Sequence, residues 1–291
     1  INTYSETDES VGGIQSVNRY FIELRQYLRN TFDDLVGGDF GALSLAVLSG
    51  DTSNLSDEAY NNFKACGATH LMAVSGFNLA VLTGMLYKIL RRLLVPKVPL
   101  VTLCALSVLF YVMLAGFSAS MVRAAIMMIV FLLSKLFSEK ADNLNSLGFA
   151  AFIVCLNPFA VTDAGALLTF TAVLGLIVIS PYMSAKIKTK NRLLKSVLGI
   201  ITASVCVFIT TFPVMYYMFG QVSIVGLILN VILIPLSEVL MITAVVFSIF
   251  ASIAPLASIS AFVLKLVSGA MLCITSYFSR FSFSTVNVGS Q

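Results

Sequence analysis

The sequence predicts an all-α polytopic membrane protein of about eight transmembrane helices, preceded by an extracytoplasmic amphipathic helix. Of the 291 residues, 58% are hydrophobic and only 11% are charged, and the mean hydropathy is +0.94. Soluble domains are about 45–50% apolar and about 25% charged. A water-soluble globular protein is therefore excluded. At about 20 residues per span, the length leaves room for roughly eight to ten spans.

Residues 1–65 are predicted to form a separate extracytoplasmic or interfacial helical region, because they hold ten of the fourteen acidic residues. The polar stretch 1–13 is expected to be disordered. Residues 17–32 place apolar side chains at helical spacing between charged ones, which predicts an amphipathic helix on the membrane surface. Gly37 and Gly38 end this helix.

Two shorter features complete this region. The apolar run 42–48 is too short to span a bilayer and is predicted to be a re-entrant or interfacial segment. Ser56 is followed by Asp57 and Glu58, which predicts a helix start with acidic groups at its positive end. The chain begins at Ile1 rather than at methionine, so we expect a fragment of a longer protein.

Residues 66–291 are predicted to be the transmembrane channel domain, and eight hydrophobic segments lie within it. These segments cover roughly residues 69–90, 99–116, 119–138, 144–160, 164–184, 193–218, 222–250 and 255–280. The seventh contains Pro235 and Glu238 and is predicted to be kinked or broken.

Loop charge predicts how these segments are oriented. Eleven of the eighteen basic residues lie in alternate connections, around residues 88–97, 135–140 and 186–195, whereas the intervening connections hold none. The positive-inside rule places the basic connections in the cytoplasm. Both the N-terminal region and the C-terminus are then expected outside the cytoplasm.

The first span opens with polar groups at His70, Ser75 and Asn78. A serine hydrolase within the membrane would need His70 to activate Ser75, but an offset of five residues on one helix does not favour that hydrogen bond. A second interpretation is close helix packing through Ser75 and Gly76. A third is a pore-lining or broken helix whose exposed N–H groups meet an anion.

Arg123 is the most informative charged residue, since a buried arginine costs at least about 2.5–3.5 kcal/mol on insertion scales. It could reach the outer interface, pair with Asp163, or provide a fixed positive charge on an anion path. Asp163 could also cap the fifth segment. Glu238 and Lys265 lie within the last two segments and could pair with each other or take part in transport.

No enzyme is predicted: the sequence suggests no catalytic residue, no metal and no cofactor. His70 is the one histidine, and the five cysteines are scattered without a metal-binding spacing. Phosphate-binding loops and the HExxH zinc motif are absent from the sequence.

A family resemblance emerges from residues 67–78, Gly-Ala-Thr-His-Leu-Met-Ala-Val-Ser-Gly-Phe-Asn. This stretch resembles the signature segment of the ComEC-type competence domain. Further landmarks of the family follow the same order along residues 40–250. They are Gly50-Asp51, Phe117 to Ala124, Ala141 to Leu147, Asn157-Pro158, Asp163 to Gly175, Phe212-Pro213, Phe219-Gly220, Leu229-Asn230 and Ile234 to Leu236.

The resemblance implies a multi-pass protein of the bacterial inner membrane that forms a channel for single-stranded DNA entering the cytoplasm during natural transformation. Carried over by position, the translocation path would include His70, Ser75, Gly76, Asn78, Arg123 and Asp163, with Glu238 and Lys265 as secondary candidates. The family commonly has a histidine where this chain has Asn78 and a glutamine where it has Leu167.

The implied partners are single-stranded DNA, the lipid bilayer, and other competence proteins such as a DNA receptor and a cytoplasmic motor. The OB-like and metallo-β-lactamase-like domains that accompany the family are expected as missing partners, since neither is found in this sequence. The alternative function is a small-solute or anion transporter that uses the same intramembrane polar residues. A structural membrane scaffold is a further alternative.

Overall fold

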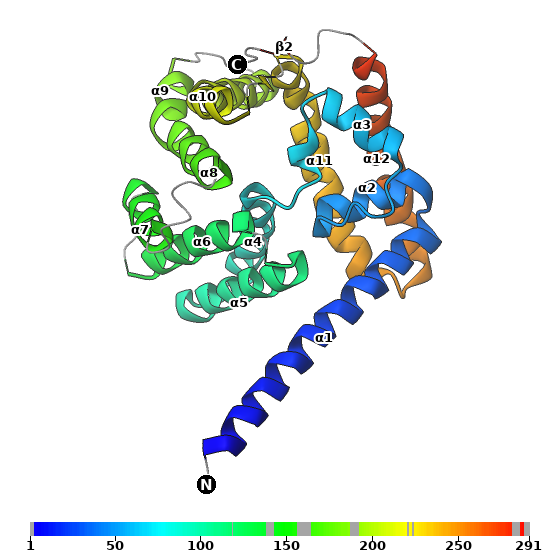
Figure 1. Cartoon of the computed structure of the whole chain (residues 1–291), viewed down its shortest axis with the longest axis vertical. Helices are drawn as coiled ribbons and strands as arrows, with labels where there is room; N and C mark the ends of the chain where they lie inside the picture. Colours follow the sequence, from blue (N-terminus) through cyan, green and yellow to red (C-terminus); the bar gives the residue numbers. More distant parts are fainter. Residues whose placement is uncertain are drawn as a thin grey trace.

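The protein is a bundle of helices in the computed structural model (Figure 1). The structure describes residues 3–117, 119–137, 143–155, 164–186, 192–219, 221–222, 224–280 and 286–287. Two strands lie within these ranges, β1 (Gln221–Val222) and β2 (Val286–Asn287), and they pair antiparallel.

The helices follow one another with short connections. In chain order they are α1 (Thr3–Leu35), α2 (Gly38–Ser49), α3 (Asp57–Ala65), the 3₁₀ turn η1 (Thr69–Leu71), α4 (Gly76–Arg92), α5 (Lys97–Ala115), α6 (Ala119–Phe137), α7 (Asn143–Cys155), α8 (Ala164–Leu174), the π-helical η3 (Gly175–Ile179), α9 (Ser180–Ser184), α10 (Arg192–Phe219), α11 (Ile224–Phe250) and α12 (Ala254–Ser279).

The prediction of an all-α membrane protein is confirmed, but the count of eight spans is not. Each of the eight hydrophobic segments corresponds to a helix or, for 164–184, to the continuous run α8–η3–α9. Within the described residues, four helical stretches are long and apolar enough to cross a bilayer. They are Lys97–Ala115, Leu167–Ser184, Leu229–Phe250 and Ala254–Ser279.

Two features differ from the prediction. The helix of the first hydrophobic segment begins at Gly76 rather than at Thr69, because the chain makes a 3₁₀ turn and then an extended stretch before α4. The seventh span is not broken, since α11 runs without interruption through Pro235. A proline removes one backbone donor, and neighbouring groups in a membrane bundle commonly compensate for that loss.

Helix α1 is longer than the sequence predicted. Disorder was expected over residues 1–13, but the chain is already helical from Thr3, and acidic residues near a helix N-terminus favour such a start. Phe21, Leu28 and Phe32 are buried, whereas Tyr20 and Tyr27 from the same predicted apolar face are exposed. The N-terminal part of α1 extends away from the other helices (Figure 1).

Helix α2 is a short helix that other helices enclose. Every residue from Gly41 to Ser49 is buried, and α2 packs against α1, α11 and α12. A helix with an interfacial face would leave that face outside the protein, whereas residues 42–48 are buried on all sides. The sequence of α2 is apolar on all sides, which is typical of a helix enclosed by others.

The C-terminal end of α2 needs hydrogen-bond donors, because the last four carbonyl groups of a helix have no partner within it. Gly50, with φ 79°, donates its N–H to Ala46 O at 2.7 Å. Asn78 Nδ2 of α4 donates to Val47 O at 3.0 Å, and the Tyr111 hydroxyl of α5 donates to Leu48 O at 2.8 Å. Side chains from two later helices thus complete this end of α2.

Helix α3 begins as predicted. Ser56 is its N-cap, and the Ser56 hydroxyl accepts a hydrogen bond from the Ala59 N–H at 3.2 Å. The Ser56 hydroxyl in turn donates to Asp39 of α2 at 2.7 Å. At the other end of α3, the Cys66 thiol donates to Thr275 O of α12 at 3.4 Å. These contacts fix α3 between α2 and α12.

We expect Tyr111→Phe to destabilise the protein by about 1–3 kcal/mol, because it leaves the buried Leu48 carbonyl without its donor. The free energy of unfolding would be measured by denaturing titration in mixed micelles. Tyr217→Phe is the matched control, since Tyr217 is 89% exposed. Equal stability of the two variants would show that this hydrogen bond does not hold the end of α2.

Candidate functional site

Two of the predicted site residues, His70 and Ser75, lie in the connection between α3 and α4, residues 66–75, and Gly76 and Asn78 follow it at the start of α4. His70 lies in η1, and its Nδ1 is 3.1 Å from Gly67 O. The His70 side chain is exposed.

Ser75 and Gly76 mark the start of α4. Ser75 is the N-cap residue in an extended conformation, and its side chain makes no capping hydrogen bond. His70 bonds to a backbone carbonyl and not to Ser75, so the two residues do not form the pair that a serine hydrolase requires. A Cβ atom added to Gly76 would lie 3.1 Å from the Ala124 Cβ of α6. The small residue therefore lets α4 approach α6 closely, as the packing interpretation predicted.

Arg123 lies one residue before this contact on α6. It is 6% exposed and therefore buried within the protein, so the interpretation that its side chain reaches the outer interface is wrong. Asp163 lies outside the described residues, as do its predicted pairing with Arg123 and its predicted capping role. The structure thus brings the beginning of α4 and the Arg123 region of α6 together.

Asn78 faces a different neighbour. It is buried and donates to Val47 O of α2, which is a structural role that the sequence did not suggest. Glu238 of α11 is half-buried, and Lys265 of α12 is exposed. These two side chains do not form an ion pair in the described part of the chain, so the suggested pairing is wrong. Leu167 is exposed on α8.

A cavity of about 460 Å³ lies between α4, α6, α7 and the α8–η3 run. Ser75 and Gly76 form part of its wall, but the other lining residues are almost all apolar, and Thr169 provides the second hydroxyl. Transferring a charged group into such surroundings without partners is costly. The cavity therefore does not suit a phosphodiester.

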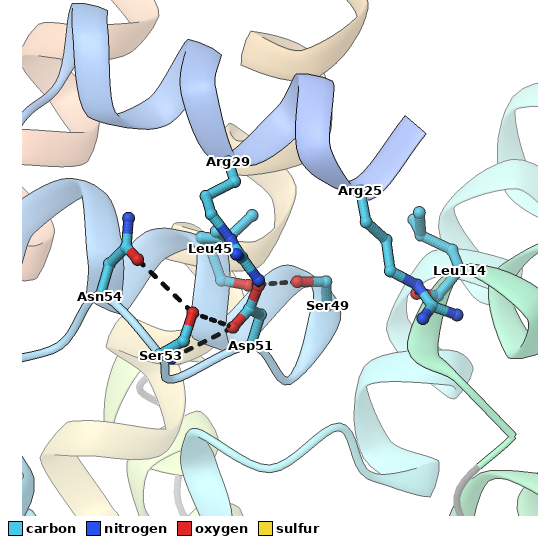
Figure 2. Close-up of polar contacts among 8 residues, drawn as sticks. All are labelled: Arg25, Arg29, Leu45, Ser49, Asp51, Ser53, Asn54 and Leu114. Atoms are coloured by element: carbon cyan, nitrogen blue, oxygen red, sulfur yellow. Dashed lines mark hydrogen bonds and ion pairs between the residues drawn. The ribbon is translucent and has the colours of Figure 1, made fainter. Parts of the chain in front are cut away.

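A polar cluster around Arg25, Arg29 and Asp51, which the sequence pattern did not reveal, connects α1 to the ends of other helices (Figure 2). Arg25 donates from Nε to Leu114 O at 2.8 Å and from Nη2 to Met113 O at 2.6 Å, so its guanidinium caps the C-terminus of α5. Arg29 donates to the Asp51 carboxylate, which follows α2. A cation at a helix C-terminus is favoured by the helix dipole.

The Asp51 carboxylate is held ionised by its neighbours. Partial burial alone would raise its pKa, but hydrogen bonds from the Ser53 hydroxyl and N–H and from Arg29 outweigh burial and hold the pKa below its usual 3.8. Asp51 belongs to the Gly50-Asp51 landmark of the family resemblance, and this landmark is the sequence signal that could have identified the cluster.

Among the described residues no group of His, Cys, Asp and Glu could hold a metal ion.

We expect Asp51→Asn to lower stability at neutral pH by an amount on the order of 1 kcal/mol, because the Arg29 side chain is partly exposed and solvent screens the pair. The lowered pKa stabilises the fold above the unfolded pKa, and this contribution is lost as the pH falls below 3.8. The difference between wild type and variant should therefore shrink on acidification.

Unfolding curves of Asp51→Asn between pH 7 and pH 3 would check this expectation. Asp33→Asn is the matched control, since Asp33 is an exposed carboxylate on α1. A stability difference that stays constant over this pH range would contradict the assignment to Asp51 ionisation.

Comparison with known proteins identifies the family. ComE operon protein 3 of Bacillus subtilis (strain 168) is 28% identical to this chain over 216 residues, which are 74% of this chain and 27% of that protein. The chain thus spans about a quarter of the length of this relative. No solved structure matches. The competence protein family matches residues 47–291, and the chain belongs to this family of multi-pass membrane proteins.

Proposed function

We propose that this chain forms the inner-membrane channel through which single-stranded DNA enters the cytoplasm during natural transformation. The observation that carries the proposal is the family match, which extends over residues 47–291 and so includes every candidate site residue. The helices that are long and apolar enough to span a bilayer are compatible with this role.

The proposed path passes the η1 turn and the contact between α4 and α6. His70 is exposed at the turn, and Arg123 places a cation beside the α4–α6 contact. A fixed positive charge attracts phosphate groups, and a small number of such charges allows the strand to leave as well as to enter. Asp163, Glu238 and Lys265 are proposed as further contributors.

The proposal also covers orientation and partners. The N-terminal region and the C-terminus lie outside the cytoplasm, with the basic connections inside. A DNA receptor delivers the strand, a cytoplasmic motor pulls it, and OB-like and metallo-β-lactamase-like domains act with this membrane core. This chain itself provides no catalytic step in the proposal.

The proposal would be tested first by deleting the gene in its native host and locating labelled donor DNA. We expect DNA to bind outside the cell without becoming protected in the cytoplasm. Unchanged transformation would remove the support for a DNA channel, and flux of small solutes in proteoliposomes would then be the next measurement.

We expect Arg123→Glu to reduce transformation to the level of the deletion strain, because charge reversal repels the phosphate backbone. Arg123→Lys retains the charge and should keep part of the activity. Arg19→Glu is the matched control, since Arg19 is exposed on α1. Immunoblots of membrane fractions would establish equal protein levels. Wild-type transformation by Arg123→Glu at a normal level would exclude Arg123 from the path.

A further inference from the structure

The cavity between α4, α6, α7 and the α8–η3 run shares Ser75 and Gly76 with the proposed path, but its apolar walls do not suit DNA. Its volume of about 460 Å³ falls within the range of roughly 300–1,000 Å³ that is usual for ligand pockets. Its walls include Met127 and Phe131 of α6, Leu147 of α7 and Leu176 of η3. An apolar occupant of this space would gain dispersion contacts that the atoms around an empty cavity lack.

The chemistry of the walls restricts that occupant to hydrocarbon. Among the lining residues that the structure describes, the hydroxyl groups of Ser75 and Thr169 are the only side-chain oxygen or nitrogen atoms. Water does not stay in cavities lined by apolar groups. An anion or a nucleotide would lose its hydration without gaining enough partners.

The cavity borders an exposed apolar surface. Leu176 lines the cavity and is also 41% exposed, and its neighbours Leu174 and Val178 are exposed as well. These residues belong to the membrane-span candidate Leu167–Ser184, of which little is buried inside the protein. In a membrane the outward side of such a span is covered by lipid acyl chains.

We propose that this cavity is a binding site for one acyl chain of a membrane phospholipid, which enters from the bilayer past Leu176. The bound chain lies against Ser75 and Gly76 and fills the space between the beginning of α4 and the α8–η3 run. The site requires only the bilayer, so it does not depend on the passage of DNA.

The absence of tryptophan from the sequence provides a direct test. Leu147→Trp would place the one tryptophan on the cavity wall, where Leu147 is 7% exposed, and Leu114→Trp on α5 is the matched control at 6% exposed. Each full-length variant would be reconstituted into phosphatidylcholine vesicles with and without bromine atoms on the acyl chains.

Bromine quenches tryptophan only at close range, so we expect a much larger loss of fluorescence for Leu147→Trp than for Leu114→Trp. Adding Ala172→Phe, which fills the cavity from α8, should remove most of that loss. Circular dichroism would verify folding, and Met127→Trp replaces Leu147→Trp if the latter does not fold.

Two results would overturn the proposal. Equal, weak quenching of the cavity and control tryptophans would mean that no acyl chain enters. Strong quenching that Ala172→Phe leaves unchanged would mean that lipid reaches the tryptophan by another route. Neither result bears on DNA uptake, which the deletion and Arg123 experiments measure separately.

Discussion

The organisation of this protein depends on the need of buried helix ends for hydrogen-bond partners. Inside a bilayer no water is available to unpaired backbone groups, so a helix that stops within the protein must be completed by other side chains. Helix α2 stops in this way, and Asn78 and Tyr111 donate to two of its last carbonyl groups. Arg25 does the same for the end of α5. The positions of α1, α4 and α5 follow from these contacts.

The same contacts position the residues of the candidate path. Asn78 anchors the first turn of α4 to α2, while Gly76 lets that turn approach α6. The η1 turn with His70 therefore connects two elements that are held in place. One is α3, whose end contacts α12 through Cys66, and the other is the beginning of α4. The apolar cavity is lined by Ser75 and Gly76 at the beginning of the same helix.

Local features could be predicted from the sequence, and contacts between distant residues could not. The Ser56 cap and the eight apolar segments depend on neighbouring residues, so pattern alone located them. Arg25 and Arg29 were interpreted as the polar face of a surface helix, because no pattern shows which helix ends lie nearby. Asn78 was assigned to the path for the same reason. The burial of α2 could have been inferred, since residues 42–48 lack a polar face.

The burial of α2 also constrains the order in which the protein can assemble. Two of the helices that enclose it, α11 and α12, lie far from it along the chain and are synthesised well after it. Until they emerge, α2 is a short apolar helix with incomplete packing and cannot hold its final place. Helix α2 therefore reaches its native position only after α11 and α12 have been synthesised, and biogenesis must keep it from competing contacts in the meantime.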